Sequence, residues 1–88
     1  KSKSLHILMV LDRARRSLRF TEIKHRVDAS STTVSRRLGE LEKGGLVIRA
    51  INPQSPQSNL YSLTDDGRLL SPIMQSMFDW AKDWWNDG

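Results

Sequence analysis

Cysteine is absent from this sequence of 88 residues, and the two histidines, His6 and His25, lie far apart. The absence of cysteine excludes disulfide bonds and thiolate metal sites within these residues. Two isolated histidines lack metal-ligand spacing, and the sequence holds no phosphate-binding glycine loop and no nucleophile–base arrangement. We therefore expect no metal, no cofactor and no enzymatic activity.

Long hydrophobic runs are missing as well. None approaches the roughly 20 residues that a membrane-spanning helix needs, and the layout of a secretory signal peptide is not seen. These absences favour a cytoplasmic protein without a membrane partner. Because the chain begins at Lys1 rather than at methionine, a preceding segment is left open. The length fits a single domain with a modest core.

Acidic residues are scarce in the first part of the chain, and basic residues are scarce in the second. Residues 1–50 contain twelve Lys and Arg against five Asp and Glu (+7), whereas residues 51–88 contain two against five (−3). A basic half joined to an acidic half indicates a nucleic-acid surface on one side only. The alternative is that the basic residues only keep a small domain soluble.

The stretch around residues 30–46 predicts a DNA recognition helix. Ser30 is an N-cap whose hydroxyl can accept from the amide of Thr33, and Gly44-Gly45 favours a helix end. Small hydroxyls and guanidinium groups on a rigid helix suit base edges and phosphates. The apolar residues repeat at i, i+4 and i+7 (Val34, Leu38, Leu41), and the opposite face carries Thr32, Thr33 and Arg36, flanked by Ser35 and Arg37.

Two helices are predicted before the recognition helix. The first covers residues 1–16, and its segment 5–11 is apolar nearly all round, so we expect neighbours on more than one side. Residues 17–20 could form a single-bridge strand, and Thr21 is the expected cap of a short helix that reaches Val27. Asp28-Ala29 then makes a tight turn into the recognition helix. Two short helices joined by such a turn make a helix-turn-helix.

A β-hairpin is predicted directly after the recognition helix. Residues 46–51 are rich in β-branched side chains, residues 52–59 read as an exposed loop, and residues 60–63 alternate as a returning strand. Such a hairpin is a wing that can contact the flank of a DNA site. The alternative is a plain connecting hairpin, since Arg49 is its one cation.

The final part of the chain predicts helical structure with two apolar stripes. Thr64 caps it, and Asp65-Asp66 suit the positive end of the helix dipole. Pro72 requires either a kink or a new helix that begins at Ser71. One stripe suffices to close the domain, so the second indicates an identical subunit. A membrane surface and a ligand pocket are alternative uses of this cluster of Trp80, Trp84, Trp85 and nearby Met residues.

Three motifs in order give the chain a resemblance to a known family. They are the Arg-Phe start at 19–20, the Leu-x-x-Leu-Glu-x-x-Gly-Leu-Val-x-Arg run at 38–49 and the Tyr-x-Leu-Thr-x-x-Gly run at 61–67. In these motifs the chain resembles the HxlR-type transcriptional regulators, a branch of the MarR-like winged helix-turn-helix proteins. The resemblance implies an α+β, mostly α fold with three helices, a two-stranded wing and a long C-terminal helix, as one dimeric domain over 1–88 with a dimerisation helix at about 64–86. Asp28 and Ala29 stand where the family usually has glycine and a large aliphatic residue.

The expected function is sequence-specific binding of double-stranded DNA by a homodimer, with helix 30–43 in the major groove and wing 49–60 along the flank. The alternative is a winged-helix module that binds proteins and no DNA. A small-molecule effector is left open, although no motif indicates one. The predicted base-reading residues are Thr32, Thr33 and Arg36; the predicted backbone contacts are Ser31, Ser35, Arg37, Arg19, Lys24, Arg49, Gln54 and Ser55; and the predicted dimer residues are Leu5, Leu8, Met77, Trp80 and Trp84.

Overall fold

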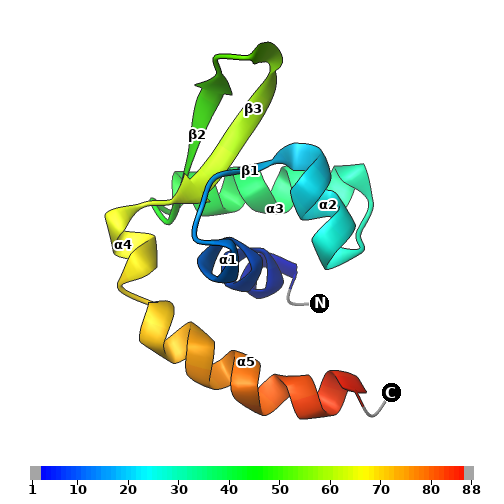
Figure 1. Ribbon diagram of the computed structural model, residues 1–88, viewed down its shortest axis with the longest axis vertical. Helices are drawn as coiled ribbons and strands as arrows, with labels where there is room; N and C mark the ends of the chain where they lie inside the picture. Colours follow the sequence, from blue (N-terminus) through cyan, green and yellow to red (C-terminus); the bar gives the residue numbers. More distant parts are fainter. Residues whose placement is uncertain (1–2, 87–88) are drawn as a thin grey trace.

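The order of elements is that of a winged helix (Figure 1). The computed structural model describes the backbone of residues 3–86 and the side chains of residues 3–55, 58–76, 79 and 80. The mainly helical α+β fold predicted from the sequence is confirmed. Its elements are α1 (Lys3–Ala14), β1 (Leu18–Arg19), α2 (Phe20–Val27), α3 (Ser31–Lys43), β2 (Val47–Asn52), β3 (Ser55–Leu63), α4 (Asp65–Arg68) and α5 (Ser71–Asn86).

The core lies between α1, the helix-turn-helix and the base of the sheet. Helix α1 is covered on more than one side, as its apolar run predicts. The inward stripe of α3 is buried in full, with Val34 at 0%, Leu38 at 2% and Leu41 at 7% exposure. Burial of such side chains is the main favourable contribution to folding. The other buried apolar residues are Ile7, Leu8, Met9, Leu11, Leu18, Ile23, Val27, Val47, Tyr61, Leu63 and Met74.

Three antiparallel strands form the sheet, in the order β1-β3-β2. The two-residue strand β1 confirms the short strand expected around residue 18, and it pairs Leu18 with Tyr61. Strands β2 and β3 form the wing hairpin, which projects away from the helices (Figure 1). The sheet therefore joins the segment before α2 to the strand that leaves the wing.

The loop predicted over residues 52–59 is wrong, because β3 begins at Ser55. Only residues 53 and 54 form the turn, and the Asn52 side-chain oxygen accepts a hydrogen bond from the amide of Gln54 at 3.0 Å. The pairing is irregular here: Asn52 opposes Ser55, whereas Ile51 opposes Asn59. The breaker residues in this segment suggested a loop, but an irregular strand tolerates such residues, proline included, at its bulges.

Two helix ends differ from the prediction. Helix α1 stops at Ala14 rather than residue 16, because Arg15 adopts a left-handed backbone with φ 56°. Helix α2 begins at Phe20, and its N-cap is Arg19 rather than Thr21. The Glu22 carboxylate accepts a hydrogen bond from the Arg19 amide at 2.9 Å, which satisfies a backbone donor at the start of the helix. The N-cap therefore lies two residues closer to the N-terminus than predicted.

The C-terminal region divides into two helices, which resolves the choice at Pro72 in favour of a new helix. Thr64 caps α4 as predicted, since its hydroxyl accepts from the Gly67 amide at 3.0 Å. The same hydroxyl donates to the carbonyl of Gly45 at 2.6 Å, and the Thr64 amide donates to the carbonyl of Leu46 at 3.0 Å. The two residues that follow the end of α3 are thus joined directly to the start of α4.

Helix α5 runs beside α1 (Figure 1), and the apolar side chains described in this region are divided between buried and exposed positions. Met74 is buried at 2% exposure, and Leu70 packs against the core. Three large apolar side chains are exposed: Leu69, which follows α4, is 76% exposed, and Ile73 and Trp80 of α5 are 58% and 66% exposed. The side chains of residues 77 and 84 lie outside the described residues. In the described part of the chain, no helix is both long enough and apolar enough to span a bilayer.

Candidate nucleic-acid interface

The outer face of α3 forms the centre of the candidate interface. Ser31, Thr32, Ser35 and Arg36 are all exposed, and they lie opposite the buried stripe of this helix. The Ser30 cap and the buried stripe hold α3 in place. The face is therefore a fixed array of hydroxyl donors and one guanidinium, which suits hydrogen bonding to bases and phosphates.

Thr33 lies at the border of this face and takes part in the helix cap. Its amide donates to Ser30 Oγ at 3.1 Å, and Ser30 Oγ donates to Thr33 Oγ1 at 3.0 Å. The Thr33 side chain is half-buried. Its hydroxyl is therefore oriented by Ser30 and keeps one proton to donate, so Thr32 and Arg36 are the more accessible of the three predicted base-reading residues.

The two neighbouring arginines of α3 differ in their surroundings. Arg37 donates to the Glu40 carboxylate at 3.0 Å, and its side chain is 32% exposed. Arg36 is exposed and makes no hydrogen bond or ion pair with any residue that the structure describes. A guanidinium has five donors, and those of Arg36 are all available to a ligand. Arg36 is the best placed cation of the helix for bidentate contact with a base.

Glu22 holds two arginines beside the start of α2. Its carboxylate lies 3.1 Å from Arg16 Nη2 and 3.5 Å from Arg19 Nε. The amide of Arg19, followed by the Arg16 guanidinium, lowers the pKa of Glu22 from its ordinary value to about 2. Glu22 is therefore ionised at neutral pH, and it offsets part of the positive charge that Arg19 offers to a phosphate. Lys24, on the same helix, is half-buried.

The wing is tied to α3 and carries two exposed isoleucines. Arg49 Nε lies 3.7 Å from the Glu42 carboxylate in the last turn of α3. Because side chains alternate along a strand, Ile51 shares the face of Arg49, whereas Ile48 points to the other side. Their exposures are 70% for Ile51 and 54% for Ile48. The wing thus offers one cation and one apolar group on the face of Arg49.

The wing turn and the start of α2 share a groove of about 450 Å³. Arg19 and Gln54, both predicted backbone contacts, line it together with Glu22 and Asn52. Ser55, the remaining predicted wing contact, is exposed at the first position of β3. The sequence did not indicate this groove or the role of Glu22, although an acidic residue three positions after Arg19 is the signal of a capping interaction.

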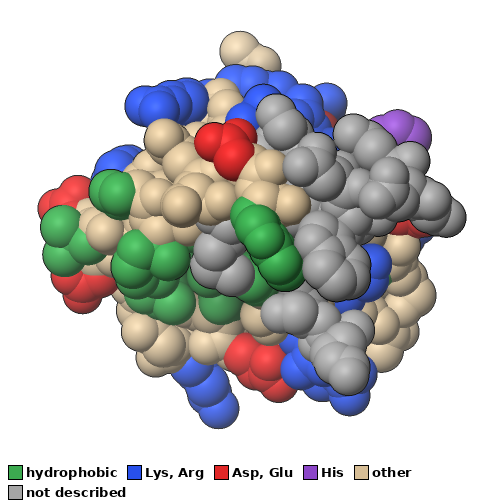
Figure 2. All heavy atoms as spheres, turned by 90° about the horizontal axis from the view of Figure 1, so that it is seen from below, with side chains coloured by type: hydrophobic (Ala, Val, Ile, Leu, Met, Phe, Trp, Pro, Cys, Tyr) green, Lys and Arg blue, Asp and Glu red, His purple; other side chains and the backbone are tan. Residues whose placement is uncertain are grey.

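The predicted dimer residues fall in different environments. Leu8 is 6% exposed and belongs to the core of the chain, so it has little surface to offer a partner, and Leu5 is half-buried against the same core. Trp80 is exposed. Figure 2, seen from the side of α5, shows hydrophobic side chains gathered on this face. Leu69, which follows α4, and Ile73, which lies in α5 as Trp80 does, are also exposed, and the predicted list omitted both.

A family model described as HxlR-like helix-turn-helix matches residues 2–88. The chain belongs to this family. The HxlR-like relatives include the uncharacterized HTH-type transcriptional regulator YvaP of Bacillus subtilis, which is 39% identical over 94% of this chain and 78% of YvaP. The HTH-type transcriptional regulator YodB of Bacillus subtilis is 34% identical over 80% of this chain and 63% of YodB. An uncharacterized HTH-type transcriptional regulator of Methanothermobacter thermautotrophicus is 36% identical over 74% of this chain and half (50%) of that protein.

Solved structures share the fold of this HxlR-like chain. FabT of Streptococcus pneumoniae, solved in complex with DNA, gives a TM-score of 0.80 at 22% identity and covers 98% of this chain and 59% of its own. The adhesin competence repressor of Streptococcus pyogenes gives a TM-score of 0.83 at 17% identity, covering 99% of this chain and 63% of its own. These likenesses establish the winged helix-turn-helix fold.

Proposed function

We propose that this chain is a transcriptional regulator that binds double-stranded DNA sequence-specifically, with α3 in the major groove. The observation that carries the proposal is the outer face of α3. Arg36 is exposed there, one helical turn after the exposed Thr32, and it has no partner among the residues that the structure describes. The family supports it, because its HTH-type members are named transcriptional regulators. FabT, which has the same fold, was solved with DNA bound.

The two ends of the interface have different roles in this proposal. Thr32 and Arg36 read base edges, and Thr33 contributes the one proton that its cap leaves free. Arg49, at the base of the wing, contacts the sugar-phosphate backbone, since Glu42 orients it without burying it. The other backbone contacts, proposed on their place around this face, are Ser31, Ser35, Arg37, Arg19, Lys24, Gln54 and Ser55.

The proposed regulator acts as a homodimer through an exposed apolar stripe that starts after α4 at Leu69 and continues along α5. Three large apolar side chains, Leu69, Ile73 and Trp80, remain more than half exposed. Groups of exposed apolar side chains of this kind mark interaction surfaces. A twofold axis at this stripe would present two copies of α3 to two half-sites of one DNA duplex. The proposal keeps the single domain over residues 1–88 that the sequence predicts, with the dimerisation region at about 64–86, of which α5 is the main helix.

A gel-shift titration with an operator and a scrambled duplex tests the assignment. A bidentate contact with a base is worth about 1–3 kcal/mol, so Arg36→Ala should weaken operator binding by about 5- to 150-fold and scrambled-DNA binding far less. Arg49→Ala should weaken both duplexes alike and reduce the slope of log affinity against log salt by about 0.9. The assignment is refuted if neither substitution changes binding.

Selection of bound sequences from a random DNA pool supplies the operator and tests the dimer. We expect inverted half-sites about one helical turn apart, 10–10.5 base pairs between centres. Ile73→Asp should shift the protein to monomers in sedimentation and abolish the paired half-sites. Ile48→Asp is the matched control, because it places the same charge at a similarly exposed isoleucine on the wing. Equal sedimentation of the two variants and the wild type would refute the α5 dimer.

A further inference from the structure

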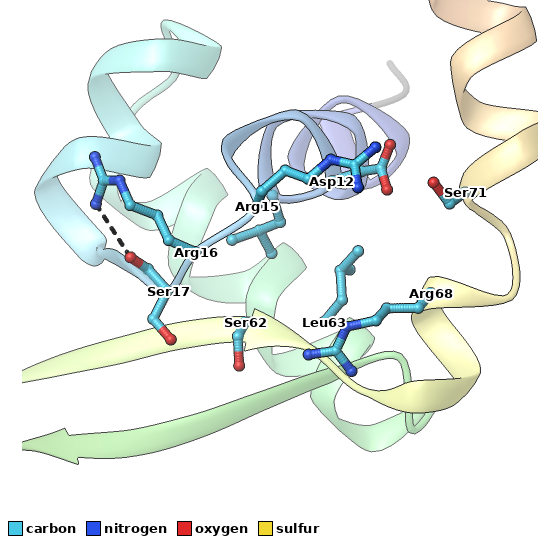
Figure 3. A pocket seen from close by; sticks show the side chains of 9 residues that line it. Asp12, Arg15, Arg16, Ser17, Ser62, Leu63, Arg68 and Ser71 are labelled. Atoms are coloured by element: carbon cyan, nitrogen blue, oxygen red, sulfur yellow. Dashed lines mark hydrogen bonds between the residues drawn. The ribbon is translucent and has the colours of Figure 1, made fainter.

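A cavity of about 480 Å³ lies between the end of α1, the end of β3 and the connection from α4 to α5 (Figure 3). Its polar lining comes from distant parts of the chain. The volume falls within the range of small-molecule sites in proteins. The groups that can bind a ligand there are the side chains of Asp12, Arg15, Ser17, Ser62, Arg68 and Ser71.

Asp12 is the unusual member of this lining. Its exposure is 8%, yet it forms no hydrogen bond or ion pair with any residue that the structure describes. A charged side chain that is almost fully buried is nearly always paired, because an unpaired buried charge is costly. Among the described residues, no side-chain oxygen is completely shielded and without a partner, so the Asp12 carboxylate reaches the cavity. Asp12 also lines a smaller pocket of about 280 Å³ together with Asp79, whose like charge disfavours an anion there, so the larger cavity is the better place for a partner of Asp12 that carries both charges.

Two guanidinium groups accompany this carboxylate. Arg15 follows α1 with a left-handed backbone, φ 56°, a conformation that is uncommon for a bulky residue and that recurs at functional sites. Its side chain makes no hydrogen bond or ion pair within the described part of the chain. Arg68 donates through Nη1 to Asp65 at 3.0 Å, which leaves its other donors available. Figure 3 shows Arg15 and Asp12 on the α1 side and Arg68 on the α4 side.

We propose that this cavity binds a small zwitterion of the amino-acid type. The ammonium group of the ligand pairs with Asp12, and its carboxylate pairs with Arg68 and Arg15. A simple carboxylic acid would bring its charge close to Asp12, and a simple amine would bring its charge close to the arginines. A ligand that carries both charges satisfies both sides, and the hydroxyls of Ser17, Ser62 and Ser71 supply further hydrogen bonds.

The position of the cavity gives such a ligand a route to regulation. Ser62 lies at the base of the wing strand β3, and Ser71 is the first residue of α5. A ligand held between them fixes the angle between the wing and the helix of the proposed dimer, and hence the spacing of the two recognition helices. This consequence rests on the proposed function, whereas binding of the zwitterion does not.

Thermal unfolding of the whole chain without DNA tests the site. The probes are the free L-amino acids, each added singly, with propionate and ethylamine as the two half-ligands that match L-alanine. At about ten times its Kd, a bound amino acid should raise Tm by about 5 to 10 °C, and the half-ligands should give no shift. Titration calorimetry of the best amino acid then gives the affinity.

Variants separate the site from general effects on stability. Asp12→Asn should abolish the shift while the ligand-free Tm stays equal or rises, because an unpaired charge is removed. Arg68→Gln, at a side chain 61% exposed, should keep the fold and weaken binding at least ten-fold. Arg26→Gln on α2 is the control, since Arg26 is an exposed arginine that does not line this cavity, and it should bind as the wild type does.

Three binding results would overturn the inference: no amino acid shifts Tm, propionate or ethylamine shifts Tm as much as the amino acid does, or both site variants keep wild-type affinity. A fourth would be a change of oligomeric state in Asp12→Asn with no effect on ligand binding, which would assign Asp12 to a contact between chains. A chain that binds DNA but no amino acid refutes this inference alone. A chain that binds an amino acid but no DNA refutes the proposed function alone.

Discussion

Gly67 is expected to tolerate no side chain, and Gly67→Ala tests the junction between the recognition helix and α4. A Cβ added at Gly67 would meet the backbone carbonyl oxygen of Leu46 closer than real Cβ atoms come, and it would lie 3.2 Å and 3.3 Å from atoms of the Leu63 side chain. The Leu46 carbonyl also accepts the amide of Thr64 at 3.0 Å. The added methyl group must therefore displace backbone, because the atom that it would meet most closely is a backbone oxygen and not the end of a side chain.

The expected cost follows from two opposing terms. Overpacking of a tight site costs typically about 1–3 kcal/mol. Replacing glycine by alanine returns about 0.4–1 kcal/mol through the lower entropy of the unfolded chain. The net loss for Gly67→Ala is about 1–2 kcal/mol, or a fall in Tm of about 5 to 15 °C for a domain of this size.

Gly39→Ala is the matched control. Gly39 is an exposed glycine inside α3, and a Cβ built there meets nothing within 4 Å. This substitution should raise stability by about 0.5–1 kcal/mol. Both variants are measured by circular dichroism at one protein concentration, since dimerisation makes Tm concentration-dependent. A Tm of Gly67→Ala at or above that of the wild type would refute the account of the junction.

Three further predictions concern the cap, the ion pair and the wing. Ser30→Ala should lower the free energy of unfolding by about 1 kcal/mol in a urea titration, and an unchanged midpoint would contradict its role as the N-cap of α3. Glu22 has a lowered pKa of about 2, so its contribution to stability is present above its unfolded pKa and is lost as pH falls through 2. Glu22→Gln should therefore be less stable than the wild type at pH 7 and converge with it near pH 2; a constant difference across that range would count against the ion pair. Ile51→Ser should weaken DNA binding by about 3- to 10-fold through lost apolar contact with the groove, whereas Ile48→Ser on the other face should not, and equal effects in fluorescence anisotropy would rule out a specific role for Ile51.

The helix-turn-helix could be predicted from the sequence because its signals are local. The period of Val34, Leu38 and Leu41, the Ser30 cap and the two glycines all lie within one short segment, and the structure bears each of them out. The start of α2 was missed because two side chains can satisfy backbone amides there: the Thr21 hydroxyl as an N-cap, or the Glu22 carboxylate by accepting from the amide of Arg19. Choosing between them depends on the backbone conformation of Arg19, which the residue types alone do not determine.

The wing hairpin itself was predicted, but the early start of β3 and the cavity were not, because their causes are not local. The residues from Asn52 to Asn59 suggest a loop, and only pairing with β2 makes most of them a strand. Asp12 follows Leu8 by one helical turn and therefore lies on a buried stripe, which is a signal in the sequence. That it lines one cavity with Arg68 depends on where α4 and α5 pack, and no local pattern encodes this.

The pairing of Leu18 with Tyr61 has a consequence for how the chain folds. Two short bridges between β1 and β3 close a loop that contains α2, α3 and β2. Closing so long a loop costs entropy before the contact repays it, so the sheet should form late, after the local helices. During synthesis, β1 must wait until Tyr61 has been made. A fragment that ends before Tyr61 retains every residue of the helix-turn-helix but leaves the Leu18 position open, so the smallest unit that folds on its own should include the wing.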